Sequence, residues 1–170
     1  MAKSEAILDA GPLIHLAEID ALDVLRDFAN LYVSNAIWEE VSRYQPNALE
    51  DSQLNINRIE APEPSIDLSL LTQALTLDKG EIEALALLEL HPQGIFLTDD
   101  TAARLAAIER GYTTHGTIGL LIRSARQGLR TSNDVLAILK EIPRKSTLHI
   151  RSKFLEDIIQ QLNIGWFNKT

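Results

Sequence analysis

Acidic side chains follow two short apolar runs of the sequence, at the point where each run ends. Asp9 comes directly after Ile7-Leu8, and Asp99-Asp100 follows the run 95–98. Such runs are typical of buried strands, and an acid just beyond a strand lies at the edge of a sheet rather than on a solvated helix face. Further acids, on segments predicted to be helical, complete a candidate set of Asp9, Glu39, Glu40, Glu81, Glu83, Asp99 and Asp100.

A cluster of these carboxylates would need a cation, because like charges brought together repel each other and lose hydration. The chain has no cysteine, which excludes thiolate zinc sites, cysteine nucleophiles and disulfides. Hard oxygen ligands suit Mg²⁺ or Mn²⁺ better than zinc. The four histidines are scattered without ligand spacing, and we interpret them as structural or surface residues: His15, His91, His115 and His149.

Each acid also has a purely structural interpretation. Asp9 could open a turn, and one member of Asp99-Asp100 could cap the following helix. Asp78 and Glu81 have the spacing of a capping box. Glu83 lies about 200° around a helix from Glu81, so a straight helix is not expected to aim both at one site. Capping accounts for one acid in several of the pairs and leaves the other without a role.

Short apolar runs alternate with helical patterns along the whole chain. Strands are expected at 5–8, 31–33, 94–98 and 112–114, with a weak one at 54–59 inside an irregular stretch over 45–65. Helices are expected at 11–17, 20–28, 37–41 (capped by Ser34 or Asn35), 66–75, 78–90, 101–110, 116–127, 132–141 and 152–162. This alternation predicts an α/β fold with a parallel sheet covered on both faces. Ligands bind such sheets beyond the carboxyl ends of the strands.

Length and composition fit one globular domain. The chain has 170 residues, of which 45% are hydrophobic and 24% charged. The charged start at Met1–Glu5 does not resemble a signal peptide, and no apolar run is long enough to span a bilayer, so we expect a cytoplasmic protein that does not contact membranes. The net charge of -8 argues against broad non-specific binding of nucleic acid, unless the acids converge on a cation.

Four segments, in this order and spacing, resemble the motifs of the PIN-domain family: 6–14, 33–41, 80–87 and 97–100. The first places Asp9 at the end of a strand before a short helix. In the second, the family's acid matches Glu40, which directly precedes Val41. The third starts a buried helix and leaves Glu81 and Glu83 open as the ligand, as the fourth leaves Asp99 and Asp100. The segment 116–121 is similar to an uncharacterised prokaryotic subfamily that includes relatives of VapC-type toxin nucleases.

This resemblance, which runs from about residue 7 to about residue 128, implies a three-layer α/β/α fold with a short-stranded parallel sheet. It implies a nuclease that hydrolyses single-stranded RNA with Mg²⁺ or Mn²⁺, with Asp9, Glu40, Glu83 and Asp100 as its catalytic acids. Toxin-like relatives pair with a small antitoxin protein and form homodimers, so both partners are expectations here. We expect one PIN-like domain over 1–170, in which 131–170 forms a C-terminal helical extension.

Two positions depart from the family pattern. Ala10 stands where the family usually has Ser or Thr, and Gly11 stands in place of Ser or Asn. The missing hydroxyl and the acidic composition favour an alternative, a degenerate PIN fold that binds a partner without cleaving. Aspartyl phosphatases of the haloacid-dehalogenase kind need a second Asp at position 11, and receiver domains need an early aspartate pair, so both are weaker interpretations.

A few further side chains have open roles. Thr117 could contact a phosphate or a metal-bound water, although helix capping at Gly116-Thr117 is the simpler interpretation. Arg104, Arg123 and Arg126 could approach a substrate, although Arg on a helix surface is usually only solvated. Apolar residues of the last forty positions have helical spacing, which is more typical of core packing than of a dimer surface: Leu136, Ile138, Leu139, Phe154, Leu155, Ile158 and Ile159.

Overall fold

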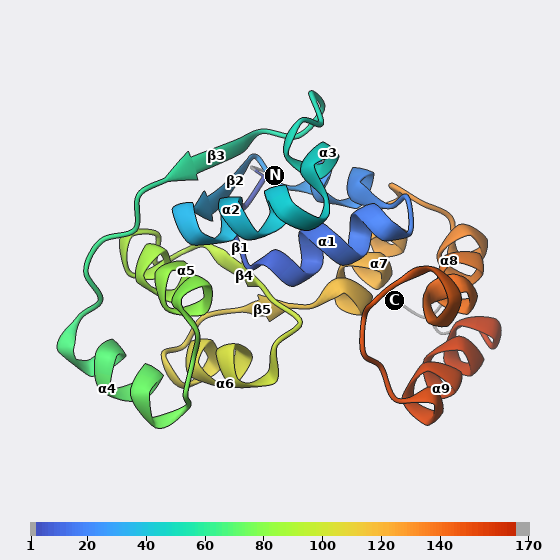
Figure 1. Ribbon diagram of the computed structural model, residues 1–170. Helices are drawn as coiled ribbons and strands as arrows, with labels where there is room; N and C mark the ends of the chain where they lie inside the picture. The colour runs from blue at the N-terminus through green and yellow to red at the C-terminus, as the bar shows by residue number, and fades with distance from the viewer. Residues whose placement is uncertain (1–2, 166–170) are drawn as a thin grey trace.

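The centre of the protein is a five-stranded parallel sheet with the strand order β3-β2-β1-β4-β5 (Figure 1). A computed structural model describes residues 3–165. Met1 and Ala2 of the charged start, and the last five residues of the expected extension, lie outside these described residues. The strands are β1 (Glu5–Leu8), β2 (Asn30–Ser34), β3 (Ile56–Ile59), β4 (Ile95–Leu97) and β5 (Thr114–His115).

Helices cover both faces of the sheet, which confirms the three-layer α/β/α architecture. Successive residues of a strand point to opposite faces, so Ala6 and Leu8 of β1 lie in one hydrophobic cluster and Ile7 in the other. The first cluster contains residues of α1 (Ala10–Glu18), the 3-10 helix η1 (Leu22–Asp27), α2 (Asn35–Tyr44), α3 (Pro46–Leu49) and α7 (Thr117–Arg126). The second contains residues of α4 (Ile66–Ala74), α5 (Lys79–Leu90) and α6 (Thr101–Glu109).

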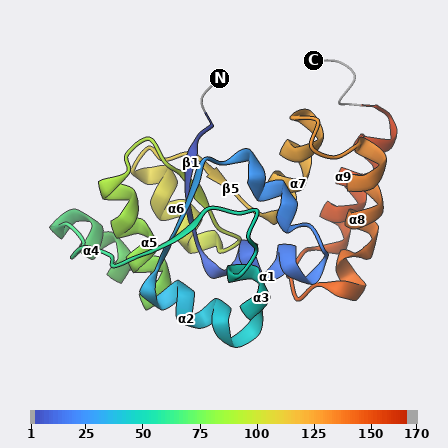
Figure 2. The same cartoon turned by 90° about the horizontal axis from the view of Figure 1, so that it is seen from above.

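Two C-terminal helices, α8 (Ser132–Lys145) and α9 (Ser152–Asn163), extend the first face beyond α7 (Figure 2). Val135 and Leu139 of α8, together with Leu155 of α9, belong to the same hydrophobic cluster as that side of the sheet. The connection between the two helices turns back toward α1, where Thr147 binds the Glu18 carboxylate through both its backbone N–H (2.6 Å) and its hydroxyl (2.7 Å). This connection therefore has a fixed position beside the N-terminal part of the fold.

Most predicted elements are present, with differences at their ends. The segment expected as a short helix over 20–28 is the 3-10 helix η1, and the irregular stretch after residue 45 contains the short helix α3. β5 starts later than expected, because the Tyr112 N–H bonds to the Ala107 carbonyl and closes α6 instead of joining the sheet. α8 continues past residue 141 and through Pro143, where the buried Ile142 holds the last turn in the core.

The parallel pairing brings the carboxyl ends of all five strands to one edge of the sheet. Ala6, Ile7 and Leu8 of β1 pair in register with Ile95, Phe96 and Leu97 of β4, so Asp9 and Thr98 follow their strands at the same level. Leu97 also pairs with His115, which places the start of α7 next to them. Among the residues that the structure describes, no helix is long and apolar enough to cross a membrane.

Candidate metal centre

Asp9 is the central acid of this edge. It follows β1 directly and is 8% exposed. One oxygen of its carboxylate accepts a hydrogen bond from the Ala10 N–H (2.9 Å), and the other accepts one from the Thr98 hydroxyl (2.7 Å). Thr98 is fully buried, and its hydroxyl in turn accepts a bond from the Asp100 N–H (3.1 Å). The end of β4 thus fixes the orientation of the acid at the end of β1.

The two acids after β4 have different partners. Asp100 caps α6, since its Oδ1 accepts the Ala103 N–H (2.8 Å). Asp99 accepts three bonds: from the Thr117 N–H (2.7 Å), the Thr117 hydroxyl (2.6 Å) and His15 Nδ1 (2.7 Å). Burial acts to raise the pKa of Asp99, but these hydrogen bonds outweigh it and hold the pKa below its ordinary value. The Asp99 carboxylate is therefore a satisfied anion that ties α1 and α7 to the end of β4.

Glu81 and Glu83, which the sequence left open, lie in different places. Glu81 lines a cavity at the sheet edge that is also lined by Asp9 and Asp100. It forms a capping box with Asp78, because each carboxylate accepts the backbone N–H of the other residue (2.8 and 2.9 Å). Glu83 does not line this cavity, and its Oε2 accepts the Ala36 N–H (2.9 Å) at the start of α2. The angular separation along α5 explains the difference.

Glu39 and Glu40 of α2 likewise differ in whether they line the cavity. Glu40 lines the cavity, and burial, followed by the negative charge of Asp78, raises its pKa above the ordinary value. Glu39 points to the outside of the helix and pairs with Arg58 (2.8 Å), whose guanidinium also lies over the Trp38 ring. The motif match therefore selected the acid that faces the site.

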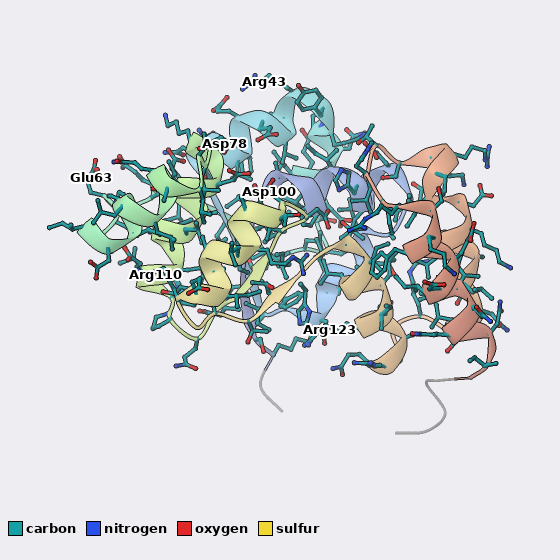
Figure 3. All side chains as sticks on the ribbon, turned by 90° about the horizontal axis from the view of Figure 1, so that it is seen from below. Arg43, Glu63, Asp78, Asp100, Arg110 and Arg123 are labelled. Atoms are coloured by element: carbon teal, nitrogen blue, oxygen red, sulfur yellow. The ribbon has the colours of Figure 1, made fainter. Side chains whose placement is uncertain are left out.

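Six carboxylates line this cavity, which has a volume of about 340 Å³ and which we call the acidic cavity: Asp9, Glu40, Asp78, Glu81, Asp99 and Asp100. None of the described residues that line it is Lys or Arg. In Figure 3, Asp78 and Asp100 mark the starts of α5 and α6, whereas Arg110 and Arg123 lie toward the other side of the molecule. The cavity is therefore a concentration of negative charge whose described wall contains two histidines, His15 and His149, but no Lys or Arg.

Two acids of the cavity have strongly raised pKa values. Burial raises the pKa of Asp9 to about 6, and the charges of Asp78 and Glu40 add to this effect against the bonds from Thr98 and Ala10. Burial also raises the pKa of Glu81 to about 7, with further contributions from Asp78, Asp100 and Asp9. Both carboxylates lack the cationic partner that would stabilise their ionised forms.

The donor set fits a hard divalent cation. All six acids are oxygen donors, and two of them have pKa values that a bound cation would lower. Within residues 3–165, no three His, Asp or Glu side chains are already close enough to hold one ion together. Coordination would therefore require rotation of the less constrained carboxylates, such as Glu40, while Asp9 keeps the orientation set by Thr98.

Several residues at the site were not expected from the sequence. Asp78 forms a capping box with Glu81, as its spacing predicts, and it also lines the cavity. His15 was interpreted as structural, yet it lies at the cavity and bonds to Asp99, a contact across 84 positions that spacing does not reveal. His149 also lines the cavity, from the connection before α9. Thr117 neither caps α7 through its hydroxyl nor points at open space, because Asp99 engages both its hydroxyl and its N–H.

Of the three arginines considered for substrate, only Arg104 lies near the site. Its Nη2 donates to the Thr98 carbonyl (2.9 Å), directly behind the acidic cavity. Arg123 instead pairs with Asp27 (2.6 Å) and stacks on Phe28, which fastens α7 to η1. That interaction has a structural purpose.

The fold and the site together define a class: a three-layer α/β/α protein with an acidic cavity at the carboxyl edge of its parallel sheet. A family model described as a PIN domain matches residues 5–164, which is nearly the whole chain, and the protein belongs to the PIN-domain family. PIN domains are generally nucleases. No curated protein matches the chain at a significant level.

Proposed function

We propose that this protein is a metal-dependent ribonuclease that hydrolyses phosphodiester bonds of single-stranded RNA. The observation that carries the proposal is the acidic cavity, in which six carboxylates converge without a Lys or Arg among the described residues of its wall. Six carboxylates gathered without a bound cation would lower the stability of the fold, because each ionised carboxylate loses hydration and repels its neighbours. A divalent cation changes this balance and creates a place where a phosphate can bind.

Four acids are the proposed ligands: Asp9, Glu40, Glu81 and Asp100. Each lines the cavity from a different element of the fold. Glu81 and Asp100 each use one carboxylate oxygen for a helix cap, and Asp9 accepts a single hydrogen bond at each oxygen, which leaves a lone pair on each. Asp99 has a supporting role in this proposal, since it accepts three hydrogen bonds, two of them at Oδ2. Glu83 is not among the proposed ligands, because its carboxylate accepts the Ala36 N–H at the start of α2.

Mg²⁺ or Mn²⁺ bound by these acids would lower the pKa of a water molecule and stabilise the charge that develops on the phosphate. The chain itself positions the ligands: the Thr98 hydroxyl orients Asp9, and the Asp100 N–H orients that hydroxyl. The bond between His15 and Asp99 fixes α1 against the cavity. No Ser, Thr or Cys nucleophile is required, which agrees with the absence of cysteine from the sequence.

A catalytically degenerate PIN fold is the second candidate, and one observation favours it. Ala10, where the family usually has a hydroxyl, lies at the cavity and is 3% exposed. The methyl group of Ala10 cannot form a hydrogen bond with a ligand carboxylate or with phosphate. In this alternative the cavity binds a cation or a basic segment of a partner without cleavage.

Mn²⁺ titration by calorimetry tests the proposal with a matched pair of variants. Glu40→Gln removes an acid that lines the cavity, whereas Glu39→Gln removes its neighbour that pairs with Arg58 outside it. We expect Glu40→Gln to weaken Mn²⁺ binding at least about tenfold and Glu39→Gln to leave it unchanged, as ligand and non-ligand acids should. Equal effects of the two substitutions would contradict the proposed ligand set.

Cleavage of a labelled single-stranded RNA then separates the two candidates. The wild type should cleave in Mn²⁺ or Mg²⁺ and stop when the metal is chelated, and Asp9→Asn should lose the activity. Metal binding with intact RNA would favour the degenerate fold. Absence of metal binding in the wild type would refute both the ligand set and the mechanism.

A further inference from the structure

A second hollow, larger than the acidic cavity, lies directly beside it. This hollow has a volume of about 780 Å³ and is bounded by α6, the start of α7, the connection 148–151 and the first turns of α9; we call it the side groove. Asp99, Leu148 and His149 line both the side groove and the acidic cavity. The two spaces therefore adjoin each other, and a chain-like ligand bound in one is well placed to extend toward the other.

The side groove has the opposite charge character from the acidic cavity. Three basic side chains line it, Arg104, Arg151 and Lys153, against two acids. Of those acids, Asp99 is satisfied by His15 and Thr117, and Asp157 pairs with Lys153 (2.7 Å). In the part of the chain that the structure describes, neither Arg104 nor Arg151 forms an ion pair, so two positive charges remain for a ligand.

The position of Arg104, which lines the side groove, is set by the backbone. Its Nη2 donates to the Thr98 carbonyl, a neutral acceptor, and among the described residues no carboxylate forms an ion pair with it. Gly116 leaves room for it, because a Cβ at that position would lie 2.6 Å from Arg104 Nη2 and 2.7 Å from Asp99 Oδ1. A guanidinium held this way suits a phosphate that is one step away from the metal site.

An aromatic ring lies on the far side of the groove. Phe154, in the first turn of α9, is 56% exposed and lines the groove with Ile118, Leu148 and Ile150. Exposed aromatic rings beside a basic track are the elements by which proteins bind single strands, since bases stack on the rings while phosphates meet the cations. Charge complementarity and the position next to the acidic cavity thus favour a nucleic-acid strand over a peptide.

We propose that the side groove binds the part of a single-stranded nucleic acid that flanks the cleaved bond, with Arg104 and Arg151 on phosphates and Phe154 under a base. This proposal rests on the proposed nuclease function, because it takes the strand from the acidic cavity into the groove. It gives the connection 148–151 and α9 a substrate-binding role, in addition to the apolar packing that attaches them to the core.

Binding of a fluorescein-labelled oligouridylate, followed by fluorescence anisotropy, tests the groove separately from cleavage. Ca²⁺ replaces Mg²⁺ in this titration, and a denaturing gel verifies that the strand stays intact. We expect Arg151→Ala to weaken binding about fivefold to tenfold and to reduce the salt dependence of log Kd by about 0.7, the value for one lost phosphate contact with a single strand. Arg26→Ala, an exposed Arg on η1, is the matched control and should change neither quantity.

Two substitutions of Phe154 distinguish stacking from simple apolar contact. Phe154→Leu keeps an apolar side chain but removes the ring, whereas Phe154→Trp enlarges the ring. We expect a loss of about fivefold or more in affinity for Phe154→Leu and retained affinity for Phe154→Trp, because stacking depends on an aromatic face. Since Phe154 is largely exposed, both variants should fold, which circular dichroism verifies.

Strand length supplies the last comparison. A dinucleotide that fills only the acidic cavity should bind the wild type and Arg151→Ala equally, whereas the longer strand should distinguish them. Cleavage with groove variants that bind the longer strand like the wild type would overturn the groove proposal and leave the nuclease function standing. Groove-dependent binding without cleavage in Mn²⁺ would support the groove and refute the nuclease. Absence of oligouridylate binding would overturn the groove proposal and leave the groove to a peptide partner.

Discussion

Removal of the Asp9 charge should make the stability of the metal-free protein less sensitive to pH. Asp9 is nearly buried, and its pKa rises from the ordinary value of 3.8 to about 6, chiefly through burial. Asp9→Asn keeps the shape of the side chain and cannot ionise. The change with pH of the difference in unfolding free energy between this variant and the wild type therefore reports the titration of Asp9, whereas the altered hydrogen bonds at this position add an amount that does not depend on pH.

The magnitude follows from the two pKa values. The folded state holds the Asp9 proton more tightly than the unfolded state, so this contribution is fully present below pH 3.8 and is lost as the pH rises through about 6. One pKa unit corresponds to ~1.4 kcal/mol, which gives a total of about 3 kcal/mol. Between about pH 4.5 and about pH 8, the wild type should lose about 2 kcal/mol relative to Asp9→Asn.

Urea or thermal unfolding in the presence of a chelator measures this difference. For a chain of this size, about 2 kcal/mol corresponds to a shift of about 4 to 8 °C in Tm between the two proteins across the pH range. Saturating Mn²⁺ at the higher pH should offset most of this loss, since a ligand at about 100 times its Kd adds about 2.7 kcal/mol to the wild type. A difference between the two proteins that stays constant with pH would refute the reasoning about Asp9.

Three further substitutions test the surroundings of the site. Thr98→Val should lower the unfolding free energy by about 1 to 3 kcal/mol in urea titrations, because it leaves Oδ2 of the buried Asp9 carboxylate without its donor; an unchanged midpoint would show that the bond contributes nothing. Glu83→Gln should lower stability by about 0.5 to 1 kcal/mol through the start of α2, with Mn²⁺ affinity in calorimetry unchanged; lost affinity would return Glu83 to the ligand set. Gly116→Ala should cost about 1 to 3 kcal/mol by thermal unfolding, because its Cβ would lie 2.7 Å from Asp99 Oδ1; wild-type stability would mean that Asp99 moves freely.

The architecture could be predicted from the sequence because its strands and buried helices are strongly patterned. The apolar runs that end at Leu8 and Leu97 have no polar interruption, and both form central strands of the sheet. The errors occur where backbone hydrogen bonds decide the outcome. Tyr112 has an apolar ring typical of a strand, but its N–H closes α6, and the pairing of β5 begins two residues later.

The candidate site could be predicted only in part, since local sequence describes an element and not what lies across from it. The position of Asp9 after a strand and of Glu40 on α2 followed from pattern and motif. The choice between Glu81 and Glu83 required the rotation of α5 about its axis relative to the sheet. The pairing of His15 with Asp99 required the whole fold, because it joins α1 to the end of β4.

Five carboxylates at or beside this edge fall into two groups, and the distinction supports a site built for a ligand. Glu39 and Asp99 each have a basic partner, Arg58 and His15, and the pKa of Asp99 is below its ordinary value. Asp9, Glu40 and Glu81 line one cavity, and all three have raised pKa values. A fold selected only for stability would have neutralised these three acids with a Lys or Arg, as Arg58 does for Glu39. Among the described residues none of the three forms an ion pair, although the charge of Arg43 acts to lower the pKa of Glu40. Such acids at the carboxyl edge, next to a groove with two arginines outside any ion pair, are the arrangement expected of a protein that takes a cation and a phosphate chain together.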